Sequence, residues 1–294
     1  MKQITIPADV PQETEKIFIT NYEAITKGTS RLMLFTGDQK IEHLNQDFHG
    51  NSLPKEVNCP THLFEIASKG YIGAFATQLG LITRYGKQYP NINYIAKLNS
   101  KTNIIPKDEK DPLSSQLWSV QDVIELKNNT NLNLCGIGYT VYLGSKYENQ
   151  MLQQAAQCIY EAHKHGLITI VWMYPRGKHI HNEANHKLIA GAAGIANCLG
   201  ADFAKINPPE GNNEQLKQIT AAAGNTKLLC SGGEKKEKKV FLQQLYDQIH
   251  TGDTRGSATG RNIFQQSLDN AISFTKAISA IVYENKSVDE VITI

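Results

Sequence analysis

Short apolar runs alternate with amphipathic stretches along most of this chain. The clearest run, residues 167–173, is rich in β-branched side chains and apolar at successive positions. The stretch before it, residues 149–165, places apolar residues at helical spacing. A strand that is apolar on both faces is typical of a parallel sheet covered by helices. The pattern therefore predicts an α/β protein.

Eight apolar runs have the length of strands, and helical patterns follow them. The predicted strands are residues 31–36, 71–76, 94–99, 132–143, 167–173, 201–206, 227–230 and 256–259. Eight β/α units in a chain of this length predict a closed (β/α)8 TIM barrel. A doubly wound open sheet is the alternative, but no G-x-G-x-x-G follows the first strand.

Outside the strands, the pattern predicts an N-terminal arm, a loop excursion and a series of helices. Residues 1–30 lack a strand signal, so we expect an arm with a short helix there and a barrel domain over residues 31–294. The excursion is polar and covers residues 100–118. Helices are expected at 61–69 (ended by Gly70), 77–89, 120–127, 149–165, 185–199, 212–223, 235–250 and from 262 onward.

Composition narrows the class of protein further. The chain is 40% apolar and 20% charged, and its net charge of +2 is too small to favour a nucleic acid or a membrane surface as partner. No signal-like segment or apolar run of bilayer length is present. The five cysteines are scattered and form no C-x-x-C pair, which is typical of a reduced cytoplasm. We therefore expect a cytoplasmic globular protein.

One lysine lies at the carboxyl end of a predicted strand, where TIM barrels carry their chemistry. Lys205 follows the apolar residues from 201 onward, and Asn207-Pro-Pro ends that strand. Loss of hydration lowers the pKa of a lysine in such a place and favours the neutral, nucleophilic amine. A lysine that extends along the barrel rim toward solvent is the equally weighted alternative from this segment alone.

The other strand ends supply side chains that favour the first of these interpretations. The candidates are Asp38 after the first strand, Lys97 at the third, and Trp172 and Tyr174 at the fifth. An acid, a phenol, an indole and two amines around one barrel mouth are more than packing requires. Of these, we expect Asp38 and Tyr174 to be catalytic together with Lys205, and Trp172 and Lys97 to bind substrate.

The seventh and eighth strands end in glycine turns that lead into helices. These turns are Ser231-Gly232-Gly233 and Gly260-Arg261. Glycine turns expose backbone N–H groups, and an arginine adds a fixed fork of donors. Because TIM barrels commonly bind phosphate after these two strands, we predict a phosphate site here in preference to ordinary turns.

Together these residues predict a reaction that needs neither a metal ion nor a cofactor. A neutral Lys205 attacks a ketone to give a carbinolamine and then an iminium, which withdraws electrons from the neighbouring carbon–carbon bond. Tyr174 would move protons, and Asp38 would hold a substrate hydroxyl or the developing cation. We expect burial beside Phe203 and Ile206 to lower the Lys205 pKa, with Lys97 as a neighbouring cation.

The ordered motifs resemble the archaeal-type class I fructose-bisphosphate aldolases over residues 30–285. The matching strings are Gly37-Asp-Gln-Lys-Ile-Glu-His43, Val171-Trp-Met-Tyr-Pro-Arg-Gly177, Ala201-Asp-Phe-Ala-Lys-Ile-Asn207, Ser231-Gly-Gly-Glu234 and Gly260-Arg-Asn-Ile-Phe-Gln265. The resemblance implies a Schiff-base lysine at Lys205, a catalytic tyrosine at Tyr174, and substrate contacts from Trp172 and Asp38. It also implies metal-independent cleavage of fructose 1,6-bisphosphate in glycolysis or gluconeogenesis, by a ring-based homo-oligomer such as a decamer.

Two departures from the family pattern leave the preferred sugar open. Gln39 and Lys40 follow Asp38 where the family often has histidine and glycine, and residues 100–118 are longer than in compact members. Related lysine-dependent transaldolases or thiolases acting on another phosphorylated ketose remain alternatives, as does a non-catalytic barrel that binds phosphosugars.

A metal-dependent aldolase is a further alternative, because three histidines follow the fifth strand. His179, His181 and His186 cluster with Glu183 in the sequence. The H-x-x-x-H spacing that places two ligands on one helical face is absent from this cluster. We therefore expect a solvated loop there and no metal site.

Overall fold

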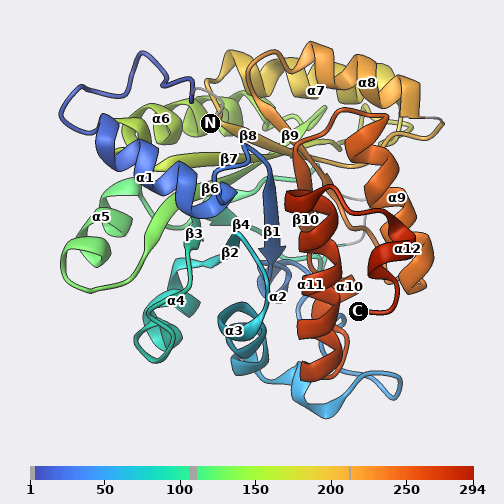
Figure 1. The fold of residues 1–294 in the computed structure, drawn as a ribbon. Coiled ribbons are helices and arrows are strands. Elements are labelled where there is room, and N and C mark those ends of the chain that lie inside the picture. Colours follow the sequence, from blue (N-terminus) through green and yellow to red (C-terminus); the bar gives the residue numbers. More distant parts are fainter. Residues whose placement is uncertain (1–3, 106–110, 212) are drawn as a thin grey trace.

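Eight parallel strands close into one barrel in the computed structural model, which describes residues 4–105, 111–211 and 213–294. Around the barrel the order is β1-β10-β9-β8-β7-β6-β3-β2 (Figure 1). The strands are β1 (Leu32–Thr36), β2 (Ala74–Gln78), β3 (Tyr94–Lys97), β6 (Leu134–Leu143), β7 (Ile168–Pro175), β8 (Phe203–Ile206), β9 (Lys227–Ser231) and β10 (Gly256–Thr259). The (β/α)8 TIM barrel predicted from the sequence is confirmed.

Helices surround the barrel. They are α1 (Glu15–Thr26), α2 (Gln39–Glu42), η1 (Lys55–Asn58), α3 (Pro60–Lys69), α4 (Leu79–Tyr85), η2 (Gly86–Gln88), α5 (Val120–Asn128), α6 (Glu148–Lys164), α7 (His186–Cys198), α8 (Asn213–Ala222), α9 (Lys238–His250), α10 (Arg261–Phe264), α11 (Leu268–Glu284) and α12 (Val288–Val291). The predicted excursion contains the antiparallel pair β4 (Asn99–Ser100) and β5 (Ser115–Gln116), and residues 106–110 of it lie outside the described residues. No helix in the described ranges has both the length and the apolar character needed to cross a bilayer.

Alternation along each strand decides which side chains enter the barrel. On β7, Ile168, Ile170 and Trp172 belong to the inner cluster of buried residues, whereas Val171 and Met173 pack in the outer cluster with the helices. Trp172 is the register partner of Lys205 on β8. Because side chains alternate with a period of two, the last inward positions of these strands lie at the carboxyl end of the barrel.

The N-terminal segment closes the opposite end of the barrel. Phe18, Tyr22 and Ile25 of α1 join the inner cluster, and α1 contacts β1, β6 and β7. Figure 1 shows α1, in blue, in front of the barrel strands. The segment that we expected to be an arm with a short helix therefore forms a 12-residue helix that covers one end of the barrel.

Several element boundaries differ from the sequence prediction by a few residues, and two of these differences have a visible cause. The second strand begins at Ala74 and not at residue 71, because the Tyr71 N–H is bound by the Thr275 hydroxyl and the side chain of Tyr71 is exposed. The single helix predicted from residue 262 is interrupted after α10, since Ser267 adopts an extended conformation and begins α11. The first difference arises from a contact between distant segments, which local patterns do not reveal, and the second from the backbone conformation of one residue.

Candidate active site

A cavity of about 140 Å³ lies at the carboxyl ends of the strands. It is lined by Thr36, Asp38, Gln39, Glu42, His43, Trp172, Tyr174, Arg176, Lys205, Asn207, Ser231, Gly232, Gly233, Ala258, Gly260 and Arg261. These residues come from the ends of β1, β7, β8, β9 and β10 and from the segments that follow them. The barrel thus brings nearly all of the predicted site residues into one cavity.

Lys205 is the amine of this cavity. Its side chain belongs to β8 and the residue is only 5% exposed, with Nζ 5.4 Å from the centre of the Trp172 ring. Burial lowers the pKa of Lys205, the charges of Asp38 and Glu42 oppose this, and Arg261 lowers it further. The amine is therefore shifted toward the neutral form that acts as a nucleophile.

The surroundings of Lys205 differ in one respect from the expectation. Arg261 is a cation that lowers the pKa of Lys205 and that we did not expect, while the expected neighbouring cation, Lys97, interacts with Lys205 by mutual repulsion. Phe203, two residues before Lys205 on β8, belongs to the inner cluster, while Ile206 packs in the outer cluster with the helices. Phe203 therefore contributes to the burial of the amine from within the barrel, and Ile206 lies on the other face of β8.

Tyr174 lines the same cavity, two residues after Trp172 on β7. Its ring stacks on that of Tyr142 at 6.3 Å, and the Arg176 guanidinium lies 5.5 Å from both ring centres. Burial and then the charge of Asp38 raise the pKa of Tyr174 well above its ordinary value. The phenol keeps its proton at neutral pH, so it is able to donate it to a departing group.

An ion-pair network fixes the wall beside Tyr174. Glu42 accepts a hydrogen bond from the Tyr142 hydroxyl at 2.7 Å and pairs with Lys101 at 3.2 Å. Burial alone would raise the pKa of Glu42, but Lys101, Tyr142 and nearby cations outweigh it and lower the pKa to about 2. Glu42 is thus a fixed negative charge, and Lys101 belongs to the excursion that the sequence marked as unusual.

Three buried polar atoms at the cavity have no hydrogen-bond partner in the described part of the chain. They are Asp38 Oδ1, Gln39 Oε1 and Trp172 Nε1. Asp38 precedes α2 without capping it through its side chain. Buried polar groups are rarely left unpaired, so groups of this kind at a cavity wall are expected to bind a ligand. A polyhydroxylated substrate would donate hydrogen bonds to the two oxygens and accept one from the indole N–H.

The two glycine turns lie together at one side of the cavity. Asn262 connects them, because its Nδ2 donates to the carbonyls of Gly232 and Glu234, both at 3.0 Å. A Cβ atom on Gly260 would come within 2.7 Å of the Thr36 carbonyl oxygen, so only glycine fits there. At the start of α10 the Ile263 and Phe264 amides donate to the Gly260 carbonyl at 2.8 and 3.0 Å, so the amides that remain are those of Arg261 and Asn262. With the Arg261 guanidinium, they offer donors for an anion.

Lys97 is the predicted site residue that the barrel does not bring into the cavity. It is 2% exposed, and its Nζ donates to the backbone oxygen and the Oδ1 of Asn99 at 3.0 and 2.9 Å. The Lys97 Nζ lies 5.1 Å from the centre of the Trp172 ring. Burial lowers its pKa to about 8. Lys97 therefore lies behind the indole and is not among the lining residues, and its binding of substrate stays a prediction.

Seven of the lining residues were not predicted as site residues: Thr36, Gln39, Glu42, His43, Arg176, Asn207 and Ala258. Glu42, His43 and Arg176 lie within the motifs that carry the resemblance, but which of their side chains face the cavity depends on the path of the loops. Asn207 accepts a hydrogen bond from the Ser231 hydroxyl at 2.9 Å and so joins two strand ends. The position of Glu42, His43, Arg176 and Asn207 within the family motifs was the signal in the sequence that could have pointed to them.

The histidines after the fifth strand do not enter the cavity. His179 and His181 are exposed, and Glu183 is bound by the Arg176 guanidinium through both of its carboxylate oxygens at 2.7–3.0 Å. Within the described ranges, no three histidine, cysteine, aspartate or glutamate side chains are grouped so as to hold a metal ion.

Comparison with known proteins defines the class to which this barrel belongs. The model of the DeoC/LacD family of aldolases matches residues 32–266. This match covers most of the chain and includes all of the candidate site residues described above. The chain therefore belongs to the DeoC/LacD aldolase family, and the protein is an aldolase, a lyase.

Particular relatives narrow the comparison. A protein of Methanocaldococcus jannaschii named "Fructose-bisphosphate aldolase/6-deoxy-5-ketofructose 1-phosphate synthase" is 51% identical over 100% of this chain and 94% of its own length. The solved fructose-bisphosphate aldolase of Slackia heliotrinireducens is 49% identical, with a TM-score of 0.97 over 99% of this chain and 93% of that one. A solved archaeal fructose-1,6-bisphosphate aldolase, whose catalytic lysine is covalently bound to the carbinolamine intermediate, is 28% identical, with a TM-score of 0.78 over 90% of this chain and 99% of that one.

Proposed function

We propose that this protein is a class I fructose-bisphosphate aldolase, which reversibly cleaves fructose 1,6-bisphosphate to dihydroxyacetone phosphate and glyceraldehyde 3-phosphate through a Schiff base on Lys205. The observation that carries the proposal is the placement of a buried amine of lowered pKa in one cavity with a phenol and an anion cradle. The likeness to relatives that bear this name supports the choice of sugar. We retain Tyr174 and Asp38 as its catalytic partners.

The reaction proceeds through covalent steps that conserve protons. The Lys205 amine adds to the C2 ketone, and Tyr174 donates its proton to the carbinolamine hydroxyl, which leaves as water. The Tyr174 phenolate then takes the proton of the C4 hydroxyl. The C3–C4 bond breaks, its electrons pass to the iminium nitrogen, and glyceraldehyde 3-phosphate departs. Protonation of the enamine at C3 by Tyr174, followed by hydrolysis, releases dihydroxyacetone phosphate and restores the amine.

The remaining cavity residues hold the substrate for these steps. Ser231, Gly232, Gly233, Gly260 and Arg261 bind a phosphate group through backbone amides and the guanidinium. Asp38 and the Trp172 indole, which have unpaired buried atoms at the cavity, bind substrate hydroxyls. Binding of this kind fixes the ketone above Lys205.

A second candidate activity follows from the name of the Methanocaldococcus jannaschii relative. Its second product name describes a ketose 1-phosphate with a methyl group at C6 and a carbonyl at C5. The same enamine of dihydroxyacetone phosphate gives this compound when it adds to the aldehyde of methylglyoxal in place of glyceraldehyde 3-phosphate. The identity of 51% over the whole chain favours testing both aldehydes.

The decisive experiment traps the Schiff base. The protein is incubated with dihydroxyacetone phosphate, reduced with borohydride, and analysed by mass spectrometry of the intact chain and of its peptides. We expect one reduced triose phosphate per chain, attached to Lys205. The Lys205→Met variant should remain unmodified and inactive. A protein without the adduct, or with the adduct on another lysine, would contradict the proposal and leave a binding barrel or a different mechanism.

The Tyr174→Phe variant separates binding of the substrate from proton transfer. We expect its KM for fructose 1,6-bisphosphate to stay within a few-fold of wild type, while kcat falls by about 10²–10⁴-fold, because a positioned proton donor is lost. Steady-state cleavage assays measure both values. Unchanged turnover would remove Tyr174 from the mechanism.

We also propose a homo-oligomer, ring-based as in the resembling family, that works in the cytoplasm in glycolysis or gluconeogenesis. The five cysteines are free thiols, which suits a reducing compartment. Light scattering of the purified protein tests the assembly, since a single chain has a mass of 32.7 kDa.

A further inference from the structure

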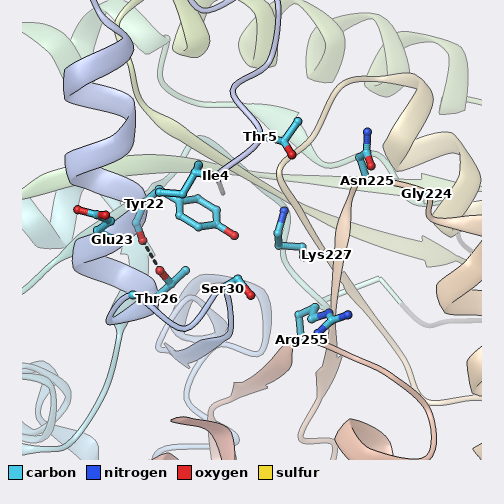
Figure 2. Close-up of a pocket in the computed structure, with 11 residues that line it drawn as sticks. Ile4, Thr5, Tyr22, Glu23, Thr26, Ser30, Gly224, Asn225, Lys227 and Arg255 are labelled. Atoms are coloured by element: carbon cyan, nitrogen blue, oxygen red, sulfur yellow. Dashed lines mark hydrogen bonds between the residues drawn. The ribbon is translucent and has the colours of Figure 1, made fainter. Parts of the chain in front are cut away.

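A second cavity, of about 250 Å³, lies at the amino-terminal end of the barrel. The polar side chains around it include those of Thr5, Tyr22, Ser30, Asn225, Lys227 and Arg255 (Figure 2). They come from the N-terminal segment, from α1 and the turn after it, and from the beginnings of β9 and β10. The proposed aldol reaction uses none of them, so the cavity needs an explanation of its own.

Lys227 is the inner cation of this cavity. Its Nζ lies 5.4 Å from the centre of the Tyr22 ring and 6.0 Å from that of Phe203. Within the described ranges, this ammonium has no hydrogen-bond acceptor and no carboxylate in ion-pair contact. A half-buried ammonium that contacts only aromatic rings has lost hydration without gaining an acceptor. An anion bound in the cavity would supply one.

Arg255 is the second cation, and its backbone is held in place. Its N–H donates to the Leu228 carbonyl, and its own carbonyl accepts from the Leu32 N–H, both at 2.8 Å. Its Nη2 atom lies 3.2 Å from a carboxylate oxygen of Asp253, whose side chain is largely exposed. A guanidinium carries five N–H donors, so one such contact leaves most of its fork available.

Hydroxyl donors complete the set around the cavity. Figure 2 shows the Tyr22 hydroxyl directed toward the Lys227 ammonium, with Thr5 and Ser30 on neighbouring walls. Burial and then the charge of Asp202 raise the pKa of Tyr22, so the phenol stays protonated. In the described part of the chain, the Tyr22 hydroxyl has no hydrogen-bond partner. It is therefore a donor placed beside two cations.

Burial lowers the pKa of Lys227 and the charge of Asp202 opposes this, but among the described residues no carboxylate makes ion-pair contact with Lys227. Asp202 accepts hydrogen bonds from the Thr169 N–H at 2.8 Å and from the Thr169 hydroxyl at 3.0 Å, and it faces His163 at 3.2 Å. Figure 2 shows the Glu23 side chain directed away from Lys227, on the other side of α1. Asp253 pairs with Arg255 at the rim, which leaves Lys227 as the lining cation without an ion-pair partner among the described residues.

We propose that this cavity binds a small phosphorylated molecule through its phosphate group. A phosphate dianion matches an ammonium, a guanidinium fork and a hydroxyl that approach it from different directions, because its oxygens accept several charge-assisted hydrogen bonds at once. The volume exceeds that of the active-site cavity, so the phosphate is accompanied by the body of a small metabolite.

The proposed site is separate from the active site but uses the same two strands. Lys227 begins β9 and Ser231 ends it, while Arg255 directly precedes β10 and Gly260 directly follows it. At roughly 3.3 Å per residue, the two ends of β9 are about 13 Å apart. One small ligand does not reach both sites. The proposal also stands independently of the aldol chemistry, because it depends only on the amino-terminal cavity.

Isothermal titration with inorganic phosphate tests the site, at constant ionic strength set with chloride. The titrations use the Arg261→Ala protein, in which phosphate binding at the active site is weakened. We expect one phosphate per chain to bind this protein. In the Arg261→Ala protein, a second substitution, Lys227→Met or Arg255→Met, should weaken phosphate binding by at least about tenfold. This is the effect of one lost charge-assisted hydrogen bond. Lys27→Met removes one charge from the same end of the barrel, outside the cavity lining, and should leave phosphate affinity unchanged.

Tyr22→Phe provides a milder variant in case loss of a cation disturbs folding. It removes only the hydroxyl and should weaken phosphate binding a few-fold, with the circular dichroism spectrum unchanged. Phosphate binding that is equal in Lys227→Met, Arg255→Met and Tyr22→Phe would overturn the proposal. So would an absence of binding to the Arg261→Ala protein, or an equal loss of affinity in Lys27→Met.

Discussion

Lys205 and Lys97 lie against the same indole ring, yet their nitrogens have different surroundings. The Lys97 nitrogen is held by two oxygens of Asn99, whereas the cavity exposes that of Lys205 beside the Trp172 ring. A Cβ atom on Gly138 would approach the Trp172 ring to 2.7 Å and Lys97 Cδ to 3.0 Å, so the absence of a side chain there makes room for both. The reactivity of Lys205 therefore depends on how the neighbouring side chains pack around the Trp172 indole.

Which residues form the site was easier to predict from the sequence than where their side chains point. Lys205, Tyr174 and Asp38 follow from strand ends and from the rule that barrel chemistry gathers there. Lys97 occupies an equivalent place in sequence, but Asn99 draws its nitrogen away from the cavity. Glu42 lies on a helix of four residues, whose orientation no periodic pattern encodes.

Replacing Arg261 should change the pH at which Lys205 reacts. Arg261 lowers the pKa of Lys205, so Arg261→Ala should raise it and move the acidic limit of Schiff-base formation to higher pH. Trapping with unphosphorylated dihydroxyacetone and borohydride over a pH series measures this, because that ketone has no phosphate for Arg261 to bind. We expect slower trapping near neutral pH, with recovery at higher pH.

Arg261→Lys is the matched control, since it keeps the positive charge. Its pH dependence should follow that of wild type. An unchanged pH dependence in Arg261→Ala would show that burial alone sets the reactivity of the amine.

At the scale of elements, the N-terminal segment is tied to the barrel through one histidine. His163, at the end of α6, is fully buried and lies 2.9 Å from Asp9 of that segment and 3.2 Å from Asp202, which directly precedes β8. Burial alone would lower the pKa of His163, but the two carboxylates outweigh it and raise the pKa. The imidazole thus connects three segments that are distant in sequence.

The pH dependence of stability should reveal this connection. A group whose pKa is raised on folding stabilises the native state fully below its unfolded pKa of about 6.5, and the effect is lost as pH rises through the folded value. We therefore expect the stability difference between wild type and His163→Gln to be largest at pH 6 or below, about 1–3 kcal/mol, and to shrink at higher pH. Urea unfolding at several pH values measures it.

Asp9→Asn is the control for that experiment and should reduce the same pH dependence. A difference between wild type and His163→Gln that stays constant from pH 5.5 to 9 would mean that the imidazole contributes packing without charge.

The order of elements was predictable because each strand and helix carries its own periodicity. The exceptions have separate causes. The start of β2 and the end of α10 are decided by contacts with Thr275 and by the extended residue Ser267, respectively. The closing role of α1 was also hidden, because a helix that covers the end of a barrel has the same sequence pattern as one on its side.

At the scale of the whole molecule, the barrel closes between its first and last strands. Leu32 of β1 is the register partner of Gly256 of β10. Gly256 has a φ of 134°, and a Cβ atom there would come within 2.0 Å of the Leu32 carbonyl oxygen. The closure therefore requires glycine at this position.

Gly256→Ala should destabilise the entire protein, because strain at the seam affects the cooperative unit. We expect the free energy of unfolding to fall by about 3 kcal/mol or more, measured by chemical denaturation. Gly191→Ala is the matched control, since no atom lies within 4 Å of the added Cβ in α7. That change should be neutral or add about 0.5–1 kcal/mol. Equal effects of the two substitutions would contradict the requirement at the seam.

The position of Trp172 has an optical consequence. The chain has two tryptophans, and the other, Trp118, is the last residue of the excursion and belongs to no barrel strand. In a Trp118→Phe protein, the sole indole fluorophore would rest against the nucleophile. Its emission would then follow each turnover without any label, as the adjacent nitrogen changes from amine to iminium and back.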